Sequence, residues 1–378
     1  MTKRTYDVAA YIWPSYTGDE LRSRIFWPEG IGEWQTVQHA KPKFEGHAWP
    51  RKPVWGYVNE ADRYVMEMQI AAAADHGVNV FIYDWYWYDN RPFLENCLND
   101  GFLQASNRSR MKFYLMWANH DVTHLWDVRT SSSECYPTVI WNGFVNREQF
   151  ETIAHRVIDK YFHQPEYYTI DGKPVFSIYY LANLIKGLGG VSETRKALDW
   201  FREECVKAGF PGLHLQIVTT GKNKVFADQE HDVQPPFGPV LQELGFDSVT
   251  YYQFCSFCDL SKGYHQVALD ARDAWLERET SFGLPLVPHV SVGWDTNPRF
   301  QALKPNILNG NTPEEIKLAL QYAKEFLDAR PNQVPLLTVN SWNEWTEGSY
   351  LEPDDLYGYQ YLQAVKDTFL APEGGDRI

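Results

Sequence analysis

The stretch VNVFIYDW, residues 78–85, is apolar, β-branched or aromatic at nearly every position. Such a run predicts a short strand that is buried on both faces. Comparable runs recur along the whole chain. Together they predict eight strands, at residues 8–13, 78–85, 112–118, 175–180, 213–219, 248–253, 286–292 and 335–341.

Helical patterns separate many of these runs, at residues 59–76, 147–162, 192–208, 265–280 and 313–329. Ser192 and Thr312 are expected to cap two of them, because each precedes acidic residues that suit a first helical turn. Apolar strands joined by crossover helices form a parallel sheet covered on both faces, and eight of them close into a barrel. We therefore predict an α/β fold with one domain, a (β/α)8 TIM barrel over residues 1–378.

Two segments depart from the simple alternation. Residues 22–57 are polar, rich in Trp, Pro and Gly, and lack periodicity, which predicts an extended loop after the first strand that folds over the barrel mouth. Within residues 167–180, Asp171-Gly172 predicts a hairpin that leads into the fourth strand.

Composition narrows the classes of function. With 44% hydrophobic and 22% charged residues, the 378-residue chain can bury a large core. The formal net charge of −14 argues against nucleic acid and anionic membranes as partners. Aromatic residues make up 16% of the chain, including 15 Trp and 23 Tyr, and such rings serve both in cores and against sugar faces.

The start of the chain, MTKRTYDVAAYIWP, leads directly into the first predicted strand, and no stretch suggests a signal peptide or a membrane span. The five cysteines are an odd number, which favours reduced thiols. We therefore expect a cytoplasmic location. The oligomeric state is left open.

Barrel active sites lie at the carboxyl ends of the strands, so the residues that follow each run are candidates for chemistry. The last run ends in NSWNEWTEG, residues 340–348, in which Glu344 and Glu347 lie three positions apart. Cleavage of a glycosidic bond needs two carboxyls, one as acid and one as nucleophile or base. We predict that these two glutamates are the catalytic pair, although the same spacing also fits solvated residues of a loop.

The segment SWNEWTEGSYLEP, residues 341–353, resembles the terminal motif of glycoside hydrolase family 99, the endo-α-mannosidase family, and includes both of its glutamates. Other strand ends resemble the related WbsX-like group more closely. These are DVAAYIWPSY (7–16), VFIYDWYWYDN (80–90), LMWANHD (115–121), FDSVTYYQF (246–254) and VSVGWDTNPR (290–299), so the resemblance spans nearly the whole chain.

The resemblance implies a retaining mechanism through a 1,2-anhydro sugar. Glu344 would deprotonate the sugar 2-hydroxyl, and Glu347 would act as acid for the leaving group and then as base for water. It also matches Tyr252 to a tyrosine near the reacting sugar and Asp295 with Arg299 to a subsite pair. A core tyrosine and an ordinary loop salt bridge are the alternatives.

The remaining strand-end residues are expected to bind carbohydrate, either by hydrogen bonds or by ring stacking. The alternative for each is a place in the packed core. They are Asp84, Trp85, Trp87, Tyr11, Trp117, Asn119, His120, Trp294, Asn343 and Trp345. His120 stands where WbsX-like sequences tend to carry Glu, so the subsite beside it is in doubt.

Neither a metal nor a cofactor is expected. His120 and His124, with Asp121 between them, could suggest a metal, but they lack a further ligand nearby and His120 stands at a strand end. Cys255 and Cys258 form a single C-x-x-C with no companion pair. The sequence GLGG at residues 187–190 does not continue into a phosphate-binding pattern.

The leading expectation is a glycoside hydrolase acting on an oligosaccharide or polysaccharide. The alternatives are a glycosyltransferase or transglycosylase of polysaccharide biosynthesis, and a barrel that binds carbohydrate without catalysis. The sugar, the linkage and the choice between endo and exo action stay open.

Overall fold

The computed structural model describes residues 4–18, 20–131, 137–221, 223–226 and 234–370. Its main sheet is parallel, with the strand order β10-β9-β8-β4-β2-β1-β12-β11. The strands are β1 (Asp7–Ile12), β2 (Val80–Tyr88), β4 (Lys112–Trp117), β8 (Lys173–Ile178), β9 (His214–Thr219), β10 (Ser248–Tyr251), β11 (His289–Ser291) and β12 (Leu336–Asn340).

The sheet closes between β10 and the residues before β11. Val249 donates its N–H to the carbonyl of Pro285 at 3.0 Å, and its own carbonyl accepts from Val287 at 2.8 Å. The α/β barrel predicted from the eight apolar runs is thereby confirmed. The seventh strand is shorter than predicted, because only residues 289–291 form a continuous ladder with β12.

The five predicted helices are present as α2 (Arg63–Asp75), α3 (Arg147–Val157), α5 (Val191–Lys207), α7 (Tyr264–Phe282) and α8 (Pro313–Asp328). Thr312 caps α8 by accepting the N–H of Glu315, as expected. Ser192 does not cap α5, because the helix begins one residue earlier and Gly190 occupies the cap position.

Among the described residues, four α-helices lie outside the five predicted ones: α1 (Trp34–His39), α4 (Leu181–Leu188), α6 (Phe237–Leu244) and α9 (Gln360–Phe369). Each is short, and α4 buries Leu181 to Ile185 without interruption. A stretch this short and this buried carries too little periodicity to distinguish a helix from a strand. The hairpin at Asp171-Gly172 is confirmed, since β7 (Thr169–Ile170) pairs antiparallel with β8.

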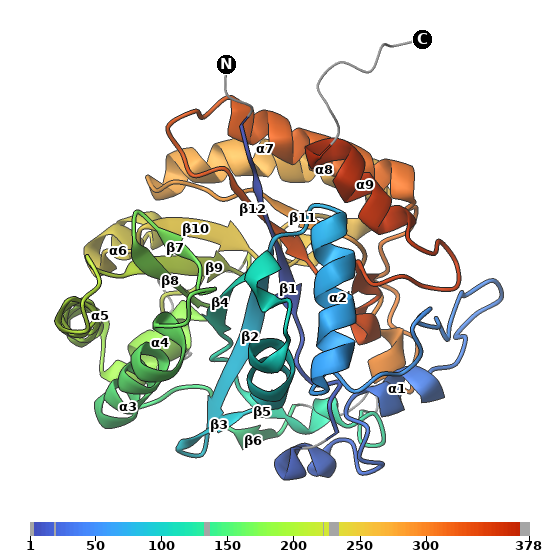
Figure 1. Ribbon diagram of the computed structural model, residues 1–378, viewed down its shortest axis with the longest axis horizontal. Helices are drawn as coiled ribbons and strands as arrows, with labels where there is room; N and C mark the ends of the chain where they lie inside the picture. Colours follow the sequence, from blue (N-terminus) through green and yellow to red (C-terminus); the bar gives the residue numbers. More distant parts are fainter. Residues whose placement is uncertain (1–3, 19, 132–136, 222, 227–233, 371–378) are drawn as a thin grey trace.

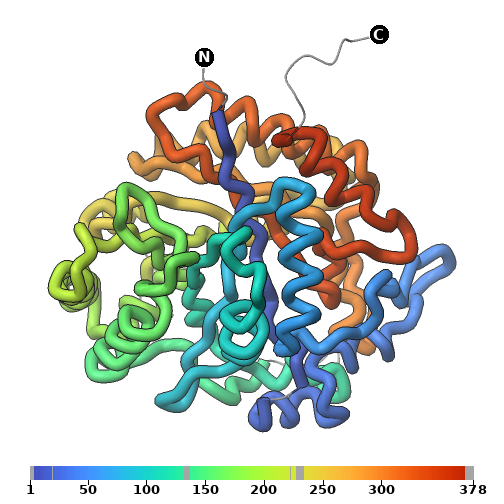
Figure 2. The backbone as a smooth tube through the Cα atoms, in the orientation of Figure 1, coloured from blue at the N-terminus to red at the C-terminus, as the bar shows by residue number. Residues whose placement is uncertain are grey.

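The carboxyl ends of the strands point toward the lower edge of Figure 1, where α1, β3 (Arg91–Phe93), β5 (Val122–Thr123) and β6 (Val139–Trp141) gather. The tube in Figure 2 shows that the first and last described segments lie at the opposite edge. There the ring of Tyr6 packs 5.3 Å from that of Phe369. The loops that follow the strands therefore surround the mouth of the barrel, away from the first and last described segments.

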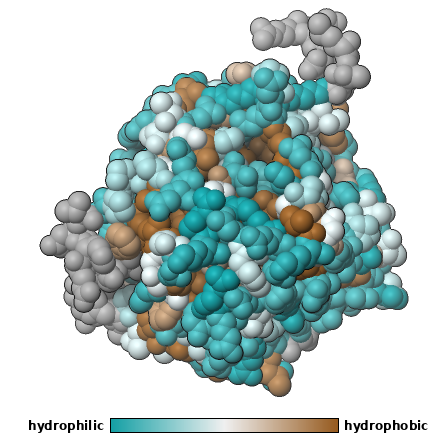
Figure 3. All heavy atoms as spheres, turned by 90° about the vertical axis from the view of Figure 1, so that its left-hand side faces the viewer, coloured by the Kyte–Doolittle hydropathy of each residue, from teal (hydrophilic) through white to brown (hydrophobic). Residues whose placement is uncertain are grey.

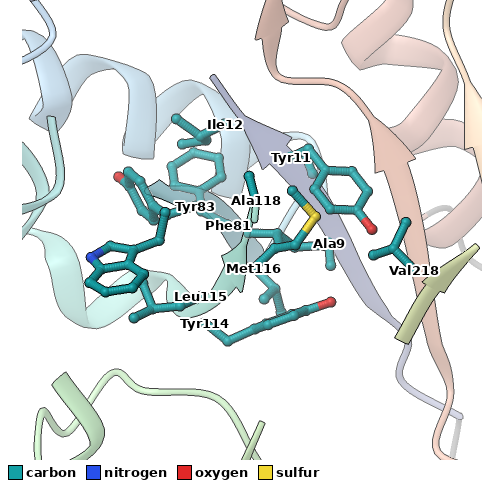
Figure 4. Close-up of a cluster of buried hydrophobic side chains, with 14 of the residues drawn as sticks. Ala9, Tyr11, Ile12, Phe81, Tyr83, Tyr114, Leu115, Met116, Ala118 and Val218 are labelled. Carbon is teal, nitrogen blue, oxygen red and sulfur yellow. The ribbon is translucent and has the colours of Figure 1, made fainter. Parts of the chain in front are cut away.

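Side chains alternate across each strand. In Figure 4, Tyr11, Tyr114 and Met116 lie on the interior side of their strands, and Tyr83 and Leu115 lie on the other side, under the helices. This alternation decides which residue of each strand end can face the mouth.

The part of the barrel interior that lies beneath the mouth is filled by hydrogen-bonded polar groups. Tyr114 donates its hydroxyl to Gln216 at 3.2 Å, and Thr338 lies 2.8 Å from Thr250 and 3.0 Å from Nδ1 of His289. Burial lowers the pKa of His289 to about 3, so this ring is neutral. These groups form the floor beneath the mouth.

The outer surface beside α3, α5 and α6 is mostly hydrophilic, with smaller hydrophobic areas between (Figure 3). Helices of a barrel bury one face against the sheet and leave the other to water. In α5 the buried side chains are Thr194, Ala197, Leu198, Phe201 and Cys205, at helical spacing.

Candidate active site

A cavity of about 450 Å³ opens at the carboxyl ends of the strands. Its walls combine carboxyls, aromatic rings and one guanidinium. The lining residues are Trp13, Glu33, Asp84, Tyr86, Met116, Ala118, His120, Trp126, Tyr179, Tyr180, Thr220, Tyr252, Arg299, Glu344 and Glu347.

Both predicted catalytic glutamates come from one tight hairpin. β13 (Asn343–Glu344) pairs antiparallel with β14 (Ser349–Tyr350), and the 3-10 turn η10 (Trp345–Glu347) joins them. Gly348 closes the turn at φ +63°, a conformation that favours glycine. The hairpin aims Glu344 and Glu347 into the same cavity.

Arg299 connects the two glutamates. Its Nη2 donates to Oε1 of Glu344 and its Nη1 to Oε1 of Glu347, each at 2.6 Å. Its Nε donates to Oε1 of a third carboxyl, Glu33, at 3.0 Å. One guanidinium therefore holds three carboxyls around it, in a geometry that suits its planar set of donors.

Tyr252 links Glu344 to Asp84. Its hydroxyl lies 2.8 Å from Oδ2 of Asp84 and 3.1 Å from Oε2 of Glu344. Oδ1 of Asp84 and Oε2 of Glu347 are buried and have no hydrogen-bond partner among the described residues. An unpaired buried acceptor costs free energy, so both oxygens suit the hydroxyl groups of a bound ligand.

Burial raises the pKa of Glu344 well above its ordinary value; Glu347 adds to this rise and Arg299 opposes it. Burial also raises the pKa of Glu347, and the charge of Arg299 opposes this rise most strongly. The pKa of Asp84 is likewise raised well above its ordinary value by burial, against the hydrogen bond from Tyr252. Carboxyls of this kind can hold protons near neutral pH, as a general acid must.

Aromatic rings surround His120 on the other wall. Its ring lies 5.5 Å from Tyr179, 5.8 Å from Tyr86 and 6.0 Å from Trp126. Burial lowers the pKa of His120, so the ring is neutral and can donate or accept a hydrogen bond. This wall offers apolar ring faces that match the C–H faces of a sugar.

Of the predicted site residues, Glu344, Glu347, Tyr252, Asp84, His120 and Arg299 meet in this cavity. The other nine lie outside its lining.

Trp85 and Trp87 alternate with Asp84 and Tyr86 along β2 and therefore point away from the cavity. Their rings stack on one another at 6.0 Å, and the indole of Trp85 donates to Glu95 at 2.8 Å. Trp117 is also directed outward, where its ring packs 6.3 Å from Phe150.

Tyr11 faces the barrel interior below the cavity. It is fully buried and donates its hydroxyl to the carbonyl of Tyr251 at 3.1 Å. Asn119 joins two strand ends instead of facing a ligand: its amide donates to the carbonyl of Tyr180 and accepts the N–H of the same residue.

Trp294 and Asp295 line a smaller cavity of about 160 Å³ on the other side of the Glu347–Gly348 backbone. Oδ2 of Asp295 accepts from the indole of Trp49 at 2.7 Å and lies 2.6 Å from Nε2 of His47. Asp295 thus fastens the segment 22–57 over the mouth. Of the expected subsite pair, Arg299 lines the larger cavity and Asp295 does not, and the alternative, a salt bridge between the two, is not present among the described residues.

Asn343 and Trp345 flank Glu344 but point into the protein. Asn343 donates to both oxygens of Glu60, at 3.0 and 2.9 Å, and Trp345 donates its indole N–H to Glu352 at 2.6 Å. The amide of Gln69 bridges the two carboxyls, at 3.2 Å from Glu60 and 2.7 Å from Glu352. These bonds hold the hairpin that carries the glutamates.

Several lining residues escaped the sequence analysis. Tyr179 and Thr220 stand at the ends of predicted strands, so the rule on strand ends could have found them. Trp126 ends the 3-10 turn η5 (His124–Trp126) and Glu33 directly precedes α1, in stretches whose sequence lacks periodicity, and no sequence signal singled them out. The segment 22–57 does fold over the mouth, as predicted, but as α1 and the 3-10 turn η1 (Leu21–Ile25) joined by loops.

Within the part of the chain that the structure describes, no group of three or more His, Cys, Asp or Glu residues could hold a metal ion. Cys255 and Cys258 are free thiols, and burial raises the pKa of Cys258 to about 12. No helix among the described residues combines the length and the apolar character needed to cross a membrane.

A family model described as glycosyltransferase WbsX matches residues 10–365. Two relatives, both named uncharacterized protein WxcX, come from two strains of Xanthomonas campestris pv. campestris. Each is 26% identical over 355 residues, which is 93% of this chain and 48% of the relative. The chain thus spans about half the length of these curated relatives.

Among solved structures, a glycoside hydrolase-like protein aligns with a TM-score of 0.61 at 16% identity, over 98% of this chain and 95% of that one. The GH99 endo-alpha-mannosidase from Bacteroides thetaiotaomicron aligns with a TM-score of 0.53 at 13% identity, over 95% of each chain. At these identities the likeness shows the fold. The family description and this shared fold support a carbohydrate-active enzyme.

Proposed function

The chain belongs to the WbsX glycosyltransferase family, and we propose that it is a glycoside hydrolase that cleaves glycosidic bonds in an oligosaccharide or polysaccharide. The observation that carries the proposal is the pair Glu344 and Glu347, both bonded to Arg299 in one aromatic-walled cavity. Glycosidic cleavage requires two carboxyls that differ in protonation on either side of the scissile bond.

The electrostatics of the cavity favour hydrolysis over transfer from a nucleotide sugar. Four carboxyls line it, and Arg299 already donates to three of them. A diphosphate would be repelled by these carboxyls, because phosphate recognition depends on cations or helix N-termini that are available to it. Glycosyl transfer is the second candidate, because the family is described as a glycosyltransferase. For transfer, a glycan would suit this cavity better as the sugar donor than a nucleotide sugar would.

We further propose a retaining reaction through a 1,2-anhydro sugar, with Glu344 as the base toward the 2-hydroxyl and Glu347 as acid and then base. Oε2 of Glu347 has no partner among the described residues and is available to a leaving-group oxygen. Burial raises the pKa of both glutamates, so either could hold the proton that a general acid needs, and the reverse allocation has Glu344 as the acid. A leaving-group series separates the two allocations.

In that series, Glu344→Gln and Glu347→Gln are assayed on natural glycans and on aryl glycosides with acidic phenol leaving groups. The variant that lacks the acid still releases phenol from the aryl glycosides in a first-turnover burst, because such a phenol departs without a proton. If both variants keep full activity on a cognate glycan, the catalytic pair is misassigned.

The function itself is tested by incubating the protein with a glycan library in plain buffer and measuring new reducing ends, with NMR to resolve the first anomer formed. Release of reducing ends with retention supports the proposal. Turnover only with a nucleotide sugar supports a transferase instead, and tight glycan binding without turnover supports a binding barrel.

A further inference from the structure

Glu33 reaches the cavity from the segment 22–57 and not from a strand end. Its N–H donates to the carbonyl of Ser15 at 3.2 Å, just after β1. The preceding Gly32 has φ +59°, and a Cβ there would lie 1.7 Å from the same carbonyl oxygen. Only glycine permits this close approach of the two backbone segments, and the approach places Glu33 beside the mouth.

The side chain of Glu33 is 2% exposed, and both of its oxygens accept hydrogen bonds. Oε1 accepts from Nε of Arg299 at 3.0 Å, and Oε2 accepts from Nη2 of Arg299 at 3.4 Å and from the indole N–H of Trp13. Because Nε is bound by Glu33, the guanidinium presents Nη1 to Glu347 and Nη2 to Glu344. The orientation of Arg299 is thus set from outside the catalytic hairpin.

We infer that Glu33 is a positioning residue, which holds the Arg299 guanidinium between Glu344 and Glu347 and takes up part of its charge. The segment 22–57 then lines the cavity and also helps to set the pKa values of Glu344 and Glu347. The inference rests on the proposed function for its catalytic meaning, but its electrostatic content does not require a substrate.

The groups that face Glu33 decide the sign of its effect. They are Arg299 on η9 (Asn297–Arg299), Glu344 on β13, Glu347 on η10, and Trp13 with Tyr16 after β1. The charge of Glu33 raises the pKa of both Glu344 and Glu347, beyond what burial does. Loss of the Glu33 charge removes this rise. It also strengthens the attraction between Arg299 and the two glutamates, and each of these changes lowers the pKa of Glu344 and Glu347.

The experiment compares Glu33→Gln with Glu29→Gln. Glu29 lies in the same segment, and its side chain is 43% exposed beside His39, so it is a matched control. Protein labelled with 13C at glutamate carboxyls is titrated by NMR, and the signals of Glu344 and Glu347 are assigned with their Gln variants. We expect both midpoints to fall by about one pH unit in Glu33→Gln and to stay in place in Glu29→Gln.

Unchanged midpoints in a folded Glu33→Gln protein would overturn the inference. If Glu33→Gln does not fold, Glu33→Asp replaces it: the shorter side chain keeps its charge but loosens its hold on Arg299. A shift of either midpoint in Glu33→Asp then supports the inference, and unmoved midpoints overturn it.

Activity gives the second readout. With a cognate glycan, Glu33→Gln is expected to move both limbs of the pH–rate profile to lower pH and to lower kcat more than it changes KM. A role in packing alone would lower the amount of folded protein without moving the profile. Absence of turnover by the wild-type protein would overturn the proposed function, and the NMR titration would still decide the role of Glu33.

Discussion

Two groups of buried carboxyls lie on either side of the hairpin that carries Glu344. The upper group faces the cavity and consists of Glu33, Asp84, Glu344 and Glu347 around Arg299. The lower group is sealed beneath the hairpin and consists of Glu60 and Glu352. Glu347 keeps 13% of its side chain exposed and the other carboxyls of both groups are buried, yet the two groups are hydrogen-bonded in different ways.

In the lower group every carboxyl oxygen accepts from a neutral donor. The donors are Asn343, Gln69, Trp345 and the thiol of Cys97, at 3.7 Å from Glu60. In the upper group a cation holds three carboxyls, and two oxygens have no partner among the described residues. A closed network of this kind fixes a structure, and open acceptors beside a shared cation leave room for a ligand.

The largest expected effect separates the two groups by activity. On a cognate glycan, Glu344→Gln and Glu347→Gln should each lower kcat/KM by about 10²–10⁴-fold, because each removes an acid or base from the reaction. Glu352→Gln should stay within about tenfold of the wild type, because its carboxyl bonds to Trp345 and Gln69 and does not line the cavity. Steady-state kinetics on folded proteins measure both. A loss in Glu352→Gln as large as that in Glu347→Gln would remove the distinction.

The next effect concerns the pH dependence of stability. Burial raises the pKa of Glu60 from 4.5 to about 7. Between these values the folded protein keeps a proton that the unfolded chain has lost, so the stability contributed by this group is complete below pH 4.5 and is lost as the pH rises through 7. The free energy of unfolding should therefore fall by on the order of 3 kcal/mol across this range.

Urea unfolding at pH 5, 6, 7 and 8 measures this slope. Glu60→Gln should make it shallower, because the amide does not titrate, while Asp84, Glu344 and Glu347 keep their own contributions. The same variant should also lower stability at pH 5 by about 1–3 kcal/mol, since a Gln amino group would face the amino group of Asn343. Glu193→Gln, in an exposed pair with Lys196, is the control and should leave the slope unchanged. An equal slope in Glu60→Gln and the control would assign the pH dependence to other groups.

The smallest effect tests the open character of the upper group. Asp84→Asn removes a buried carboxyl whose pKa is raised and whose Oδ1 is unpaired among the described residues, and it keeps an acceptor for Tyr252. The free energy of unfolding at pH 8 should rise by about 1 kcal/mol, while affinity for glycans falls. Thermal unfolding and calorimetric titration with a cognate glycan report the two changes. Loss of stability would place Asp84 with the closed lower group.

Strand alternation explains which part of the site the sequence could predict. The rule that strand ends carry the active site led to Asp84, Tyr252, Glu344 and Glu347, all of which meet in the cavity. The same rule also selected Trp85 and Trp87, because aromatic residues on both faces of β2 look alike in sequence. Only the register of β2 against β1 and β4 directs Asp84 inward and its neighbours outward.

Asn343 and Trp345 illustrate a second limit. They belong to the motif that carries the family resemblance, so they were expected to bind substrate. Their donors instead meet Glu60 and Glu352, which lie 283 and 7 residues away in the chain. A motif identifies residues that occur together, but it does not distinguish those that touch a ligand from those that support them.

The amino-acid sequence by itself determined the eight-stranded barrel and the position of the glutamate pair, because both depend on local patterns. These patterns are apolar runs of strand length and a short motif that follows the last run. Only the tertiary structure brought Glu33 and Arg299, 266 residues apart, into one ion pair. Long-range contacts of this kind depend on how loops pack over the mouth. The sequence of a loop without periodicity does not indicate which distant residues it will contact.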